Sequence, residues 1–303
     1  MKQLKLTTIT ILILLLNSSS RAQQDAGTCI EPTPGDYTTN VANKQKVHNF
    51  FIISQPKKGK LDLGSRYSIL RAKMKSFFRQ KKFVAIVAKD IQMVSAKMQY
   101  RLDKYNTKIG TLWFDSHGTF KKGYSVFFTG KDEFNYRSVN DTSFIKPLQE
   151  LAVYADENSK VVIGSCYGGA TFHRKSLHSN DTTRMNGDSL MMGLGKIFTR
   201  SVIYASESWV MTKPGLFQKK AAVAGHPTRK LFKDIVYHPA WENMSRWNEY
   251  NAAKKNFCAV NPVTLDMYGN LVVRSDSYAG KTRVKKEIEK TLTKLRPGLL
   301  KVK

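Results

Sequence analysis

The sequence is poor in the residues that build metal centres. Its 303 residues include only 3 cysteines and 6 histidines. None of them stands in a metal-ligand pattern such as Cys-x-x-Cys or His-x-x-x-His with a carboxylate, so we expect no metal site. No internal repeat and no low-complexity segment is visible in the chain.

Long apolar runs are also missing. The stretch Leu6–Leu16 covers 11 residues, whereas a helix that crosses the hydrocarbon needs about 18–20. Two lysines precede it and small residues stand at positions 20 and 22, which is the anatomy of a secretory signal peptide. We therefore expect residues 1–22 to be removed after Ala22. The mature chain is then secreted or periplasmic, with no membrane span.

Acidic residues are scarce, with 23 Asp and Glu against 50 Lys and Arg and a formal net charge of +27. The positive electrostatic field of such a charge favours association with polyanions, but net charge alone indicates no mechanism. The lysines are scattered and no nucleic-acid-binding motif is present, so we expect no specific nucleic-acid partner. Non-specific binding to anionic surfaces is the expected use of the charge.

The apolar content, 41% with 16 Phe and 13 Tyr, is enough for a core. Residues 23–47 are rich in Gly, Pro, Thr and Asn and form an extended lead-in. From residue 48 to 210 apolar runs alternate with helical spacing, which predicts a mostly parallel sheet with helices on both faces. Residues 211–303 form a C-terminal extension that packs on this domain or completes it.

The individual elements follow from periodicity and capping. Expected strands cover 48–54, 83–88, 109–118, 161–166 and 201–206; expected helices cover 65–80, 94–106, 142–156 and 187–199; a hairpin covers 123–137. In the extension we expect helices over 240–257 and 282–295 and a hairpin over 264–273.

A cysteine and a histidine follow two of the expected strands. VVIGSC ends in Cys166, and IGTLWFDSHG ends in His117 and Gly118. Because parallel strands lie about 4.8 Å apart and end at the same edge of a sheet, we expect these side chains to converge. The thiolate form of a cysteine is a nucleophile, and a nearby imidazole can accept the proton of the thiol. The amides of Gly118 and Cys166 suit a developing oxyanion, since glycine allows close approach.

This pattern resembles the caspase-like clan of cysteine peptidases, which includes caspases, metacaspases, legumains, gingipains and clostripain-like enzymes; its secreted bacterial members are the most similar. The resemblance covers residues 48–210 and implies a caspase-hemoglobinase α/β three-layer sandwich. It also implies a cysteine endopeptidase without a cofactor, acting on protein or peptide substrates through a thioester. His117 matches the dyad histidine, Gly118 the oxyanion glycine and Cys166 the nucleophile. Gly164 stands where several members have aspartate, and Tyr167 follows the cysteine, so no subfamily is assigned.

Specificity in that clan depends on the pocket for the residue before the scissile bond. The segment SESW follows the fifth expected strand, so we expect Glu207 and Trp209 to line this pocket and to favour a basic side chain. Asp188 is a weaker candidate for the same role. Residues 172–188 are expected to form a long basic loop, in which Lys175 or Arg184 would be a point of self-cleavage.

An odd number of cysteines in an exported chain predicts one pair and one free thiol. We expect Cys29 and Cys258 to form the disulfide and Cys166 to stay free.

Two other functions fit the same residues. Residues 164–168 match the G-x-C-x-G elbow of glutaminases and amidohydrolases, with His226 or His238 as the base. The chain would otherwise be a non-catalytic caspase-like binding or effector protein. His173 and His178 follow Cys166 closely and compete with His117 as the base.

Overall fold

A computed structural model describes residues 46–54, 63–118, 123–175, 182–207, 210–212, 222–224 and 247–273. Several predictions of sequence analysis fall outside these ranges: the signal peptide, most of the lead-in, the helix over 282–295, Cys29, His178, Trp209, His226 and His238.

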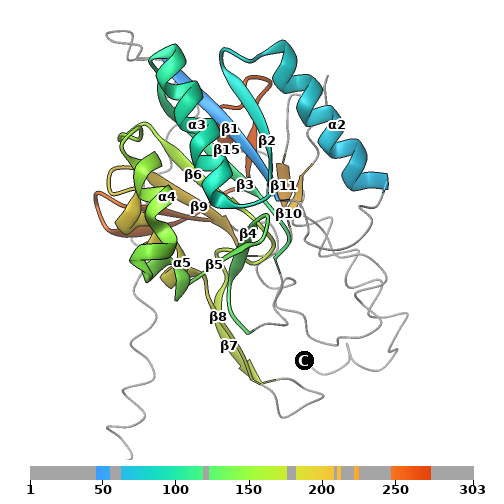
Figure 1. Ribbon diagram of the computed structural model, residues 1–303. Helices are drawn as coiled ribbons and strands as arrows, with labels where there is room; N and C mark the ends of the chain where they lie inside the picture. Colours follow the sequence, from blue (N-terminus) through green and yellow to red (C-terminus); the bar gives the residue numbers. More distant parts are fainter. Residues whose placement is uncertain are drawn as a thin grey trace, which may run out of the picture.

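A seven-stranded sheet forms the centre of the molecule, with the strand order β13-β12-β9-β6-β3-β1-β2 (Figure 1). Its strands are β1 (Val47–Ser54), β2 (Phe83–Ala88), β3 (Lys108–Asp115), β6 (Lys160–Gly164), β9 (Val202–Ser206), β12 (Trp247–Asn251) and β13 (Asn256–Val260). The first five are mutually parallel. β12 runs antiparallel to β9 and β13 antiparallel to β12. The expectation of a mostly parallel α/β sheet is confirmed.

Three helices and a hairpin cover one face of this sheet (Figure 1). They are α3 (Ile91–Tyr105), α4 (Thr142–Ala152), α5 (Gly187–Ile197) and the hairpin of β4 (Val126–Thr129) and β5 (Asp132–Asn135), followed by the short helix η1 (Ser138–Asn140). Their apolar side chains form the larger core cluster with residues such as Leu112, Phe114 and Ile163 of the strands.

The opposite face is covered by one helix and by short strands. These are α2 (Leu63–Phe78), β10 (Val210–Thr212), β11 (Ala222–Ala224), β14 (Val263–Leu265) and β15 (Leu271–Val273). Trp113, Val162 and Tyr204 point from the sheet into this second core, where Val210 packs against it. The two faces therefore use alternate residues of the same strands, as the pleat requires.

Helix starts follow from side-chain caps. α3 begins at Ile91, three residues before the expected start, because the carboxylate of Asp90 accepts a hydrogen bond from the amide of Met93. Asp141 does the same for α4 by accepting from the amides of Ser143 and Phe144. Such a cap stabilises a helix by about 1 kcal/mol.

Two predictions of local structure are wrong. The expected loop over 172–188 contains an antiparallel pair, β7 (Thr171–Lys175) and β8 (Thr182–Asn186). The described part of the expected helix over 240–257 is extended, because Trp247–Asn251 pairs with β9 and returns as β13. Pairing with the sheet edge and burial of Trp247 outweigh the helical propensity of this segment. The extension thereby contributes strands to the main sheet.

Candidate active site

The strand register places His117 and Cys166 at the same level of the sheet. In the β3–β6 pair Asp115 lies opposite Gly164, so each candidate follows its paired strand end by two residues. Both strands are central and parallel. The expected strand over 109–118 ends earlier, at Asp115, which leaves His117 and Gly118 in the loop beyond the sheet.

The main chains of Gly118 and Cys166 are in direct contact. A Cβ on Gly118 would overlap the carbonyl oxygen of Cys166 and would lie 2.8 Å from its amide nitrogen. No residue with a side chain fits here without a shift of one of the two loops. The geometry therefore brings the second predicted backbone donor, the Gly118 amide, next to the cysteine.

The sulfur of Cys166 is partly buried and lies against β10. The amide of Val210 donates to Sγ at 3.4 Å, and the thiol lies 3.9 Å from the carbonyl oxygen of Val210. Burial raises the pKa of the Cys166 thiol; the amides of Val210, Gly118 and Cys166 itself oppose this, and the negative charge of Asp115 adds to it. Burial dominates, so the free protein holds a neutral thiol at neutral pH.

The imidazole of His117 is exposed. Within the described residues no hydrogen bond joins it to Sγ of Cys166, which instead contacts the main chain of Val210. A thiolate–imidazolium pair is therefore not formed in this state. Catalytic hydrogen bonds often tighten only when substrate is bound, so the absence of this bond in the free protein is compatible with a catalytic base at position 117.

The turn after β6 fixes the cysteine. Tyr167 follows it with a φ of 61°, in the left-handed region, and is buried. The single hydroxyl proton of Ser125 is shared between the carbonyls of Tyr167 and Ala170, which lie 3.0 and 3.1 Å from Oγ. The amide of Gly169 donates to the carbonyl of Ser206 at the end of β9. A strained residue that is held by so many bonds is typical of functional turns.

Of the predicted specificity residues, Glu207 lies at the same edge of the sheet as Cys166, whereas Asp188 lies on a helix of the other face. Glu207 is buried directly after β9, the strand next to β6. Asp188 lies in the first turn of α5, where its carboxylate accepts a hydrogen bond from the amide of Ser189 at 2.7 Å. α5 packs on the face of the sheet opposite to β10, so this local bond explains Asp188 without a pocket. Trp209 lies outside the described residues.

Sequence analysis missed Asp115, the charge that acts on the sulfur of Cys166. It stands two residues after Trp113, which faces the second core, so strand alternation places it on the β10 side of the sheet. That alternation was a usable signal.

The structure also explains the glycine at position 164. A Cβ there would overlap the indole nitrogen of Trp113 and would lie 2.7 Å from the carbonyl oxygen of Phe114. The aspartate that some caspase-like enzymes carry two residues before the cysteine has no room here. Among the described residues, Asp115 on the neighbouring strand is an acid that acts on the sulfur.

The remaining cysteines agree with one free thiol. Cys166 is free and Cys258 takes part in a disulfide. The predicted partner, Cys29, lies outside the described residues, so its pairing stays a prediction.

The described part of the chain holds no group of three or more His, Cys, Asp or Glu side chains suited to a metal ion. None of its helices is both long and apolar enough to span a membrane.

Comparison with known proteins gives no relative: no family model, no curated protein and no solved structure matches the chain.

Proposed function

We propose that this chain is an exported cysteine endopeptidase of the caspase-like type, with Cys166 as nucleophile and His117 as proton carrier. The observation that supports the proposal is the β3–β6 register, which aligns the ends of two central parallel strands, Asp115 and Gly164; His117 and Cys166 each follow two residues later. The contact between the main chains of Gly118 and Cys166 supports it independently.

In the proposed reaction Sγ of Cys166 bonds to the carbonyl carbon of the scissile peptide. The thiol proton passes to the imidazole of His117 and then to the departing nitrogen as the C–N bond breaks. Water, deprotonated by the same imidazole, then attacks the thioester, and the thiol is released with its proton. The protein supplies all groups for both steps, and no cofactor takes part.

The oxyanion formed in each step needs fixed donors. The amides of Gly118 and Cys166 are both directed near the sulfur, where each lowers the pKa of the thiol. We expect them to donate to a carbonyl oxygen that is bound beside the sulfur. One such donor is typically worth about 3–4 kcal/mol in the transition state.

The resting state of this enzyme has a neutral thiol. Burial raises the thiol pKa of Cys166, and the exposed imidazole of His117 is free to turn toward an incoming substrate. Activation therefore requires the substrate to order His117 against the sulfur.

Two carboxylates at the same edge of the sheet support a preference for a basic residue before the scissile bond. Asp115, at the end of β3, acts on the sulfur electrostatically, and Glu207 is buried after β9, on the other side of β6. A lysine or arginine side chain that reaches this edge would be attracted by both. Self-cleavage at Lys175 or Arg184 stays part of the proposal; Arg184 lies opposite His173 in the β7–β8 pair, so the hairpin must open first.

The raised pKa of the buried thiol also fits a second candidate, a non-catalytic caspase-like binding protein. In that case Cys166 is a small core residue at a strand end.

One experiment separates the two functions. A panel of fluorogenic peptides with Arg, Lys, Asn or Asp before the scissile bond is incubated with wild type, Cys166→Ala and His117→Ala. We expect cleavage after Arg and Lys and no turnover by either variant. If the wild type cleaves no peptide of the panel, or if Cys166→Ala still cleaves them, the peptidase proposal is wrong.

A further inference from the structure

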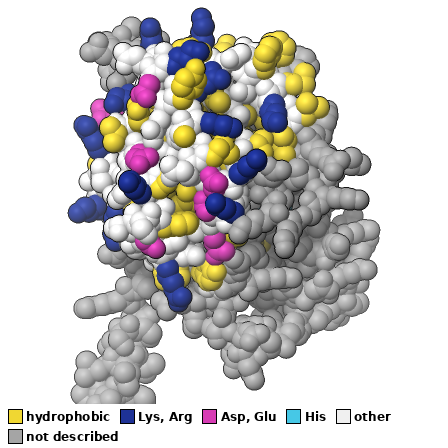
Figure 2. Space-filling model, in the orientation of Figure 1, with side chains coloured by type: hydrophobic (Ala, Val, Ile, Leu, Met, Phe, Trp, Pro, Cys, Tyr) yellow, Lys and Arg dark blue, Asp and Glu magenta, His cyan; other side chains and the backbone are white. Residues whose placement is uncertain are grey.

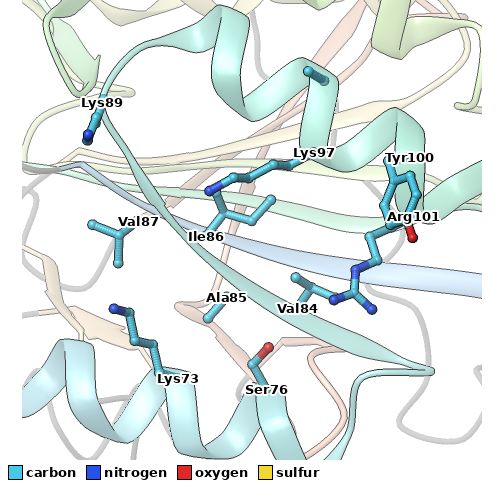
Figure 3. Close-up of a pocket in the computed structure, with 11 residues that line it drawn as sticks. Lys73, Ser76, Val84, Ala85, Ile86, Val87, Lys89, Lys97, Tyr100 and Arg101 are labelled. Carbon is cyan, nitrogen blue, oxygen red and sulfur yellow. The ribbon is translucent and has the colours of Figure 1, made fainter.

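The outer edge of β2 offers a second binding site, remote from Cys166. β2 ends the sheet order, with β1 between it and β3, and among the described strands only β1 pairs with it. A groove of about 710 Å³ follows this edge between α2 and α3 (Figure 3). The lining residues come from all three elements: Lys73 and Ser76 of α2, Val84–Val87 of β2 and the following Lys89, and Ala96, Lys97, Tyr100 and Arg101 of α3.

The backbone of β2 can take a further strand here. The amide of Asn49 on β1 donates to the carbonyl of Lys82 at 2.9 Å. In a parallel pair, residues that bond to the neighbour alternate along the strand. Val84 and Ile86 therefore face β1, and the amides and carbonyls of Ala85 and Val87 face the groove. An exposed edge of this kind is a template for β-augmentation.

The groove is cationic on both sides. Lys73 extends from α2, and Lys97 and Arg101 extend from α3, all toward the strand between them (Figure 3); Lys89 stands at the strand's end. Among the described residues, no acidic side chain lines the groove and no carboxylate forms an ion pair with any of these four cations. Figure 2 shows Lys and Arg side chains spread over this face of the molecule, with apolar side chains between them.

Apolar surface adjoins the charges. Tyr100 is 61% exposed, and Met74 and Phe77, beside Lys73 on α2, are 40% and 68% exposed. A ligand that alternates apolar and acidic side chains would meet both kinds of surface.

We propose that the β2 groove binds an extended peptide segment rich in Asp and Glu, which pairs as a new strand with Ala85 and Val87. A second copy of this chain fits less well, because it would bring two sets of the same cations together. A flat anionic membrane would satisfy the charges but could not pair with main-chain groups between two helices. The groove selects an anion that also has a peptide backbone.

The test uses the full chain as Cys166→Ala, so that no probe is cleaved. A fluorescein-labelled decapeptide of alternating valine and glutamate is titrated by anisotropy, and hydrogen exchange of residues 83–88 is followed by mass spectrometry. We expect saturable binding with slower exchange in β2. The same peptide with N-methylated central residues cannot pair as a strand and should not bind, and a valine–lysine peptide should not bind either.

Charge variants check the site. Lys73→Glu/Lys97→Glu should weaken binding by at least about tenfold, since two ion pairs become repulsions. The matched control Lys146→Glu/Lys254→Glu reverses the charge of two exposed lysines elsewhere on the surface. At physiological salt, which screens distant charges, it should leave the affinity within about twofold.

Three results would overturn the proposal. If the N-methylated peptide bound as tightly as the unmodified one, charge alone would explain the binding and no strand would be formed. Binding of phosphatidylglycerol vesicles but not of the peptide would make a membrane the partner. A dimer that the Lys73→Glu/Lys97→Glu variant breaks, without peptide binding, would make it a self-association surface. None of these results bears on peptidase activity.

Discussion

Replacing Gly118 by alanine tests the proposed active site most directly, because the residue is neither nucleophile nor base. Its added Cβ would lie 2.8 Å from the carbonyl carbon and the amide nitrogen of Cys166 and would overlap the oxygen. These neighbours are main-chain atoms, which cannot rotate away as a side chain does. The loop that carries Gly118 must therefore move away from the turn that carries Cys166.

The size of this movement determines how far kcat and the free energy of unfolding fall. Loss of one oxyanion donor lowers kcat by about 100- to 1000-fold, and a displacement of about 1 Å in a reacting group has a similar effect. Overpacking of this kind lowers the free energy of unfolding by about 1–3 kcal/mol. We expect Gly118→Ala to stay folded at 25 °C and to lose at least about 100-fold in kcat, with a smaller change in KM.

The assay pairs initial rates on the Arg and Lys peptides with thermal unfolding by circular dichroism. Gly123→Ala is the matched control, because no atom of the described residues lies within 4 Å of a Cβ there, while its φ of +73° makes a side chain strained. That strain is about 1–2 kcal/mol, so the control should lose stability but keep kcat. If Gly118→Ala retains wild-type kcat, or loses no more than Gly123→Ala does, the oxyanion reasoning is wrong.

Three further measurements follow from the same structure. Because burial raises the pKa of the Cys166 thiol above its ordinary value of 9.0, the rate of alkylation by iodoacetamide should have its midpoint above pH 9, and His117→Ala should leave it unmoved; a midpoint near 6 would reveal a preformed ion pair. Burial lowers the pKa of His48 from 6.5, so below pH 6.5 the unfolded chain binds a proton that the folded chain refuses. The contribution to stability is full above pH 6.5 and is lost as the pH falls toward the lower value, by about 1.4 kcal/mol per pH unit; urea unfolding of His48→Gln should lack this slope, and an equal slope in both would reject the assignment. Gly164→Ala should lower the free energy of unfolding by about 1–3 kcal/mol, because its Cβ overlaps the indole of Trp113; an unchanged urea midpoint would show that the indole yields.

The central strands could be predicted because their sequences are uninterrupted apolar runs. Phe83–Ala88 has the expected bounds, and the strand that precedes Cys166 ends at Gly164, where the run meets small residues. Helix starts were less accurate, since the cap at Asp90 decides where α3 begins. Such a cap is a single side-chain bond and leaves no periodic signal.

The segment that became β12 and β13 could not be predicted from local sequence. Tyr250 and Phe257 have the spacing of a helix face, but their rings contact each other at a tilted angle across two antiparallel strands, with centroids 4.6 Å apart. What decides between these structures is the free edge of β9, which is distant in sequence. The groove at β2 could not be predicted for the same reason. Whether a strand lies at the edge of a sheet depends on the spatial order of the strands, which local sequence does not show.

For the candidate site, strand ends gave the pair His117 and Cys166, and the register supports their alignment. Strand ends did not indicate Val210, whose amide donates to the sulfur from β10. That contact depends on how a short strand after β9 folds back over the sheet. Neither spacing nor residue type encodes it.

The two serines that precede the candidate residues show how the turns are held. Ser116 and Ser165 point to the face opposite the sulfur, where both bind β4. The Ser116 hydroxyl accepts from the amide of Phe128 at 3.0 Å, and the Ser165 hydroxyl donates to the carbonyl of Val126 at 2.9 Å. One short strand thus fixes the ends of β3 and β6 relative to each other, and the residues that follow inherit that spacing. In Ser-His-Gly and Ser-Cys-Tyr the first residue therefore positions the second, from the face of the sheet opposite the sulfur.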